Sequence, residues 1–241
     1  MAGHSKWANI QHRKGAQDAK RGVLFQKLSK EIYVAATKGT DPSMNPALRL
    51  AVSKAKAQSM PKSNIEKAIS KAAGVGGNGS GYTEYLYSGT LSGGATILIS
   101  CLTDNFNRLS SILKAYFNKQ NGQMGKAGAI PYVFDQKGLI IFDVKNYTED
   151  EITLVAIENG AEDIEFEENM VTITSAPSDL SQLSEALEKE FNIEKFERSE
   201  VTYLPNSKVE LDEEKTQKIL NSIDALEEEE DIQEVYHNLE I

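Results

Sequence analysis

The chain has 241 residues, 40% of them hydrophobic and 26% charged, and a formal net charge of −10. This composition is typical of a globular protein and excludes a disordered, collagen-like or coiled-coil chain. Cys101 is the only cysteine, which excludes an internal disulfide and a multi-cysteine metal site. No apolar run approaches the roughly 20 residues that span a bilayer, and the first residues lack a secretory signal. We therefore expect a cytoplasmic protein without membrane segments.

Charge is segregated along the chain. Residues 1–81 contain 14 Lys/Arg against 4 Asp/Glu, a net charge of +10, whereas residues 82–241 contain 12 against 32, a net charge of −20. A basic segment can bind phosphates while an acidic remainder suppresses indiscriminate association. The distribution therefore predicts a basic module, joined to an acidic one, that binds nucleic acid.

The first part of the chain indicates an arm followed by a helix. Residues 1–22 combine cations and glycines without a sustained apolar period, which predicts a flexible basic arm. From residue 23 apolar side chains recur at helical spacing: Leu24, Leu28, Ile32 and Ala35. This pattern predicts an amphipathic helix that ends near Gly39.

Capping signals predict two more helices. Asn45 is a suitable N-cap, and Pro46 fits the first helical position. Ser63 and Glu66 have the spacing of a capping box, and Gly74 follows as a stop. Together with the first helix, these segments predict a small three-helix domain.

A glycine-rich run over residues 74–81 contains the spacing GxGxxG. A dinucleotide-binding fingerprint follows a strand and opens a helix, whereas this run follows a predicted helix and precedes a strand-like segment. We therefore interpret the run as a linker. The predicted helical domain and its linker then span residues 23–81.

From residue 82 onward, strand and helix patterns alternate, which predicts an α+β fold. The expected strands are 84–88, 95–102, 130–134, 139–143, 163–167, 171–174, 196–201, 208–211 and 232–236, and the expected helices are 108–120, 149–158, 180–189 and a last one containing Ile219 to Leu226. The order strand, helix, strand, strand, helix, strand within residues 135–201 is that of a ferredoxin-like unit. We predict two α+β, ferredoxin-like domains after the helical one. The second domain is formed by residues 82–134 and 202–241, and the third, residues 135–201, is inserted into it.

Catalytic chemistry has few candidates in this sequence. The three histidines, His4, His12 and His237, lack the spacing of a zinc site. Nucleophile-elbow, HExxH and P-loop motifs are missing, and the acidic run at residues 227–231 is more simply a solvated turn. Cys101 lies in an apolar strand and is expected to be a buried thiol. The sequence therefore predicts a protein that is not an enzyme and needs no metal or cofactor.

The arm combines phosphate-binding cations with planar side chains that stack on unpaired bases, a mixture that suits single-stranded or looped RNA. These residues are His4, Lys6, Trp7, Asn9, His12, Arg13 and Lys14. The alternative is a solvated tail, which Trp7 disfavours. Five or six phosphate contacts predict a salt slope of about −4 for a single strand and about −5 for a duplex. The basic residues that could extend this surface are Lys27, Lys30, Arg49, Lys54, Lys56, Lys62, Lys67 and Lys71.

Four segments closely resemble the YebC/PmpR family, which includes a mitochondrial translational activator of cytochrome c oxidase: MAGHSKWANIQHRKGAQDAKRG, NPALRLAVSKAKAQSMPKSNIEKAI, LTDNFNR and DIQEVYHN. The resemblance implies three domains, with the third inserted in the second, and nucleic-acid binding. The family's basic positions correspond here to Lys6, His12, Arg13, Lys14, Lys20, Arg21, Lys54, Lys56 and Lys62. Phe106 and Ala47 stand where the family usually has a basic residue, which leaves Arg108 as the better candidate in the second domain.

Two functions remain open on this reading, together with a third from another class. The leading hypothesis is a non-catalytic translation factor that binds rRNA or tRNA on the ribosome and relieves stalled translation. The rival is a DNA-binding transcriptional regulator, although the third helix offers no obvious Arg or Gln reader at its start. The third is a protein-interaction scaffold that would survive loss of the arm. No small-molecule substrate is expected.

Overall fold

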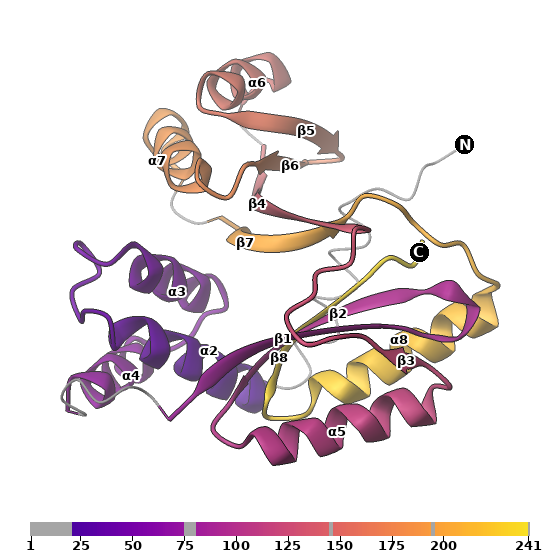
Figure 1. Ribbon diagram of the computed structural model, residues 1–241. Coiled ribbons are helices and arrows are strands. Elements are labelled where there is room, and N and C mark those ends of the chain that lie inside the picture. Colours follow the sequence, from indigo (N-terminus) through magenta and orange to yellow (C-terminus); the bar gives the residue numbers. More distant parts are fainter. Residues whose placement is uncertain (1–20, 75–80, 145–146, 194–195, 241) are drawn as a thin grey trace.

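A computed structural model describes residues 21–74, 81–144, 147–193 and 196–240 (Figure 1). The first of these ranges forms three helices: α2 (Arg21–Ala36), α3 (Pro46–Ala57) and α4 (Lys62–Gly74). Their apolar faces form one core that includes Leu28, Ile32, Leu48 and Ile65. The predicted helical domain is therefore confirmed, whereas the predicted arm lies outside the described residues.

The starts of α3 and α4 differ from each other. The Asn45 side chain accepts a hydrogen bond from the Leu48 amide at 3.1 Å, so the predicted N-cap is confirmed. The predicted capping box of α4 is wrong, because Ser63 lies inside the helix. The carbonyl oxygen of Pro61 accepts hydrogen bonds from the amides of Asn64 and Ile65, so the helix begins at Lys62, two residues before the start that a Ser63 cap implies.

The first sheet contains β1 (Thr83–Thr90), β2 (Thr96–Thr103), β3 (Gln123–Met124) and β8 (Ile232–His237). They are antiparallel in the order β3-β1-β2-β8, and a short 3-10 turn, η1 (Ser92–Gly94), joins β1 to β2. Helices α5 (Phe106–Lys119) and α8 (Glu213–Glu227) cover one face of this sheet and close its core (Figure 1). The last strand thus returns to the first sheet, as the insertion hypothesis predicts.

The second sheet lies between β3 and α8 in the chain. Its elements are β4 (Phe134–Asp143), α6 (Glu149–Glu158), β5 (Ala161–Glu167), β6 (Met170–Ser175), α7 (Leu180–Phe191) and β7 (Arg198–Pro205). The strand order β5-β6-β4-β7, with α6 and α7 packed on one face, is the ferredoxin-like arrangement. The sequence predicted an inserted domain of residues 135–201, but β4 begins one residue before that range and β7 ends four residues after it. We therefore propose residues 134–205 as the inserted unit.

Two predicted strands are wrong and one strand was not predicted. Residues 130–133 form no strand and lead through a turn, in which the amide of Phe134 bonds to the carbonyl of Pro131 and Tyr132 is 89% exposed, so that β4 begins only at Phe134. Residues 208–211 contribute only an isolated bridge between Val209 and Leu239. The short β3 pairs with the end of β1, a tertiary contact that leaves no periodic signal in a two-residue strand.

The three units pack against one another. The uncovered face of the first sheet presents Leu98 and Tyr236 to Phe134 and Tyr203 of the inserted sheet. Helix α3 lies against β7, the edge strand of that sheet (Figure 1). No helix within the described ranges is long and apolar enough to cross a membrane.

Candidate nucleic-acid interface

The predicted contact residues differ in where the structure places them. Those of the arm lie outside the described ranges: His4, Lys6, Trp7, Asn9, His12, Arg13, Lys14 and Lys20. Arg21 is the first residue of α2. The six others differ in exposure, since Lys56, Lys62 and Arg108 are exposed, Lys54 is half-buried, and Lys27 and Lys30 are buried.

Lys27 and Lys30 fix α2 to the end of α8. The Lys27 ammonium donates to the carbonyl oxygens of Glu227 at 2.6 Å and Gln233 at 3.4 Å, and Lys30 donates to that of Glu230 at 3.0 Å. Glu227 is the last residue of α8, where carbonyl groups lack partners within the helix. Both lysines therefore hold two parts of the chain together.

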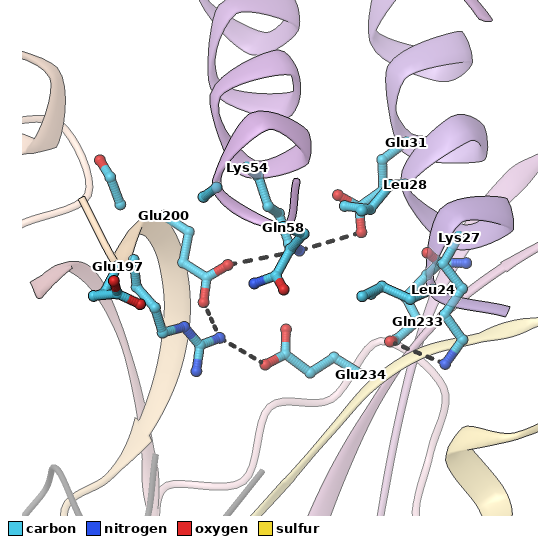
Figure 2. Close-up of a pocket in the computed structure, with 13 residues that line it drawn as sticks. Leu24, Lys27, Leu28, Glu31, Lys54, Gln58, Glu197, Glu200, Gln233 and Glu234 are labelled. Atoms are coloured by element: carbon cyan, nitrogen blue, oxygen red, sulfur yellow. Dashed lines mark hydrogen bonds and ion pairs between the residues drawn. The ribbon is translucent and has the colours of Figure 1, made fainter. Parts of the chain in front are cut away.

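A cluster of alternating charges joins all three units (Figure 2). Lys54 of α3 lies 3.2 Å from Glu31 of α2 and 3.6 Å from Glu200 of β7. Arg198 of β7 pairs with Glu200 and lies 3.3 Å from Glu234 of β8. These five side chains, which we call the junction cluster, bring the helical domain and both sheets into contact.

In the junction cluster, each charged group stabilises the ionised form of its neighbours of opposite charge. Burial alone would lower the pKa of Lys54, but the carboxylates of Glu31 and Glu200 outweigh it and hold that pKa above its ordinary value. Burial raises the pKa of Glu31, and Lys54 offsets only part of that rise. The adjoining cavity has a volume of about 40 Å³, room for water but not for a nucleotide. The cluster is therefore an internal contact.

Arg108 forms a fork with Asp231. Its Nε and Nη2 donate to the two carboxylate oxygens of Asp231 at 2.6 and 2.7 Å, and Nη2 also donates to Asp104 at 2.9 Å. Asp231 is 1% exposed. Its burial would raise the pKa of the carboxyl, yet hydrogen bonds from Arg108 and Thr103 bring the pKa of Asp231 below its ordinary value. The guanidinium therefore stabilises a buried carboxylate of the same chain.

The structure separates the predicted cations into two sets. Four of them make contacts between parts of the chain: Lys27, Lys30, Lys54 and Arg108. Lys56 and Lys62 face solvent, and Lys62 lies 3.7 Å from the exposed Glu66. Lys56 and Lys62 therefore stay candidates for nucleic-acid contact, whereas the first four are engaged internally.

Further exposed cations lie on α3 and α4: Arg49, Lys67 and Lys71. Arg49 lies 3.9 Å from Glu185 of α7. Lys67 and Lys71 lie four residues apart on one face of α4, a spacing that can be seen in the sequence. Neither lysine has an ion pair among the described residues. In the same ranges, no group of three or more His, Cys, Asp or Glu side chains could hold a metal ion.

Comparison with known proteins finds similarity along the whole chain. A model of the TACO1/YebC N-terminal domain matches residues 5–75, and a model of the TACO1/YebC second and third domains matches residues 82–239. A probable transcriptional regulatory protein of Mycoplasmopsis synoviae is 55% identical over 100% of both chains, and one of Geobacillus kaustophilus is 46% identical over 100% of this chain and 98% of its own. The crystal structure of a conserved hypothetical protein from Aquifex aeolicus has a TM-score of 0.82 and 40% identity, covering 98% of this chain and 97% of its own.

Proposed function

Because the chain belongs to the TACO1/YebC family, we propose that it is a non-catalytic cytoplasmic regulator of gene expression that binds nucleic acid. In this proposal it acts as a translation factor. Its basic arm and the exposed cations of its helical domain bind rRNA or tRNA on the ribosome, and binding relieves stalled translation. It uses neither a cofactor nor a small-molecule substrate.

The observation that carries this proposal is the net positive charge of the helical domain. Residues 21–74 contain 10 Lys/Arg against 3 Asp/Glu, a net charge of +7. Three of the lysines are engaged in contacts with the rest of the chain, which leaves exposed cations on α3 and α4: Arg49, Lys56, Lys62, Lys67 and Lys71. Charge of this kind on a chain that is acidic elsewhere supports a phosphate-rich partner.

The shape of the helical domain supports RNA over a duplex groove. Helix α4 buries one face against α2, and its first turn, residues 62–65, carries neither the Arg nor the Gln that often reads a base edge in the grooves of a duplex. Structured RNA exposes unpaired bases and phosphates to surfaces without such a reading helix. Transcriptional regulation through DNA is the second candidate, favoured by the names of the relatives.

The proposal is tested by crosslinking the protein to nucleic acid in growing cells and sequencing what is attached. An Arg13→Glu/Lys14→Glu variant removes arm cations, and a Lys114→Glu/Lys119→Glu variant makes the same charge change on α5, where both lysines are exposed. We expect rRNA or tRNA with the wild type and the α5 variant, and loss of it with the arm variant. Recovery of promoter DNA with RNA at background would replace the translation function by the transcriptional one.

A further inference from the structure

A basic and aromatic pocket lies where α2 and α4 meet the residue that precedes β1. Its volume is about 250 Å³, and its lining includes Lys30, Tyr33, Asn64, Lys67, Lys71 and Tyr82. Figure 1 shows α2 and α4 side by side, with the chain entering β1 beside them. At this size the pocket is smaller than the roughly 300–1,000 Å³ of sites for drug-sized ligands. It therefore suits one small group of a larger ligand.

The pocket attracts an anion. Among the described residues, three ammonium groups line it and no Asp or Glu does. Lys30 is compensated from outside the pocket by Glu230 at 3.0 Å and Asp231 at 3.9 Å. Lys67 and Lys71 have no such partner in the described chain, and like charges four residues apart on a helix repel each other. A bound anion between them would relieve that repulsion.

Aromatic rings form the other side of the pocket. Tyr33 and Tyr82 lie edge to face, with ring centroids 6.0 Å apart and an interplanar angle of 80°. Lys30 Nζ lies 5.3 Å from the ring centroid of Tyr82, and Lys71 Nζ lies 5.6 Å from that of Tyr33. At these distances, cation–π attraction keeps the ammonium groups beside the rings. The pocket can therefore offer ammonium groups to a phosphate and aromatic rings to a base at the same time. The Asn64 amide at the pocket can both donate and accept a hydrogen bond.

We propose that this pocket, which we call the α2–α4 pocket, binds one nucleotide of single-stranded RNA. Lys67 and Lys71 contact its phosphate, Tyr82 contacts the base, and Asn64 bonds to the base edge. A single strand is favoured because a base enters a concave site only when it is unpaired. The inference rests on the proposed function, since it names where the helical domain holds the RNA.

The first test is the salt dependence of binding to a labelled single-stranded RNA of mixed sequence, with the full chain. Lys67→Gln/Lys71→Gln removes two phosphate contacts, and Lys114→Gln/Lys119→Gln makes the same charge change on α5. We expect the pocket variant to lose roughly tenfold or more in affinity and its salt slope to become less steep by about 1.4, at about 0.7 per contact. The α5 variant should retain both values.

The second test measures stacking of the base, whereas the first measures contacts with the phosphate. A single-stranded RNA carrying one 2-aminopurine loses fluorescence when that base stacks on an aromatic ring, so wild-type protein should alter its emission. Tyr82→Leu keeps an apolar side chain and should abolish the change while lowering affinity roughly tenfold. Thermal melting of each variant checks that it folds, and ultraviolet crosslinking of wild-type protein should attach RNA to the peptide that contains Tyr82.

The outcomes distinguish the pocket from the function. If wild-type protein binds RNA, loses it in the Arg13→Glu/Lys14→Glu variant and keeps it unchanged in Lys67→Gln/Lys71→Gln, the pocket assignment is wrong and the proposed function stands. If wild-type protein binds no RNA at all, the function is wrong and the pocket falls with it. Equal losses with single-stranded RNA and single-stranded DNA of the same sequence would correct the ligand to either nucleic acid.

Discussion

The ammonium of Lys27 donates a hydrogen bond of 2.6 Å to the carbonyl oxygen of Glu227, 200 residues further along the chain. Burial lowers the pKa of Lys27 by more than the carboxylates of Glu227, Glu234 and Glu31 raise it. Lys54, only one helix away, shows the opposite balance, because its carboxylate partners outweigh its burial. Two lysines that share the acidic neighbours Glu31 and Glu234 therefore contribute differently to stability.

We expect Lys27→Met to change the free energy of unfolding by less than about 1 kcal/mol near neutral pH, since loss of the hydrogen bond is offset by relief of a desolvated charge. A lowered pKa in the folded state means that the unfolded chain binds more protons between that pKa and the ordinary lysine value. Wild-type stability should therefore gain a contribution as the pH rises through that alkaline window, and the variant should lack it. Urea unfolding at neutral and alkaline pH measures both effects.

Lys54→Met should be costlier, because it leaves Glu31 and Glu200 without their cation. Removing one partner of a fully buried ion pair lowers the free energy of unfolding by about 3–5 kcal/mol. Because the Lys54 side chain is 30% exposed, we expect a loss of about 2–3 kcal/mol. Lys56→Met, two residues away and exposed, is the matched control and should cost under about 0.5 kcal/mol. Partial recovery in Lys54→Met/Glu31→Gln, measured by urea unfolding, would locate the effect at the carboxylate. Equal costs for the two lysines would contradict this account.

Acid stability should depend on Arg108. The lowered pKa of Asp231 means that its contribution is present above the unfolded aspartate pKa, near 3.9, and is lost as the pH falls through the folded value. Arg108→Gln removes the largest contribution that lowers this pKa, so the carboxyl of Asp231 should have a higher pKa than in the wild type. Melting temperatures measured over acidic to neutral pH should then begin to fall at a higher pH than in the wild type, with a loss of about 1–2 kcal/mol at neutrality. Arg108→Lys should fall between the two.

An element of the fold can be predicted from the sequence when neighbouring residues determine it, and it is missed when distant parts of the chain do. Helix α6 was predicted with its observed bounds, and its start is fixed locally, since Thr148 and Glu151 form a capping box within four residues. Strand β3 was missed because it is fixed by the opposing end of β1. The site divides in the same way: the sequence shows that Lys30 and Lys67 are cations, but only the folded chain shows that the first is buried against a distant loop and the second faces a pocket.

Cys101 should resist thiol reagents in the folded protein. It is 1% exposed, and burial raises the pKa of its thiol to about 12. At about pH 8 an ordinary thiol is partly ionised, whereas this one is neither ionised nor reachable. Labelling followed by mass spectrometry should show no modification under native conditions and complete modification in concentrated guanidinium chloride. Rapid native labelling at the full rate of a free thiol would contradict its burial.

Gly89 should tolerate no side chain. A Cβ at this position of β1 would overlap the Phe117 ring and the carbonyl oxygen of Gln123, so the helix and the neighbouring strand would both have to move. We expect Gly89→Ala to cost about 2 kcal/mol, through overpacking rather than backbone strain. Gly81→Ala is the control and should leave the melting temperature nearly unchanged, because among the described residues, its chain neighbours apart, no atom lies within 4 Å of the added Cβ.

The insertion also sets an order of folding during synthesis. All strands of the inserted unit lie within residues 134–205, so this unit has every part it needs before α8 and β8 have been made. The first sheet, by contrast, receives β8 and α8, the second of the two helices that cover its core, only from residues 213–237. We expect a nascent chain to carry a finished ferredoxin-like unit on an unfinished host, whose apolar face stays open until its last strand pairs with β2.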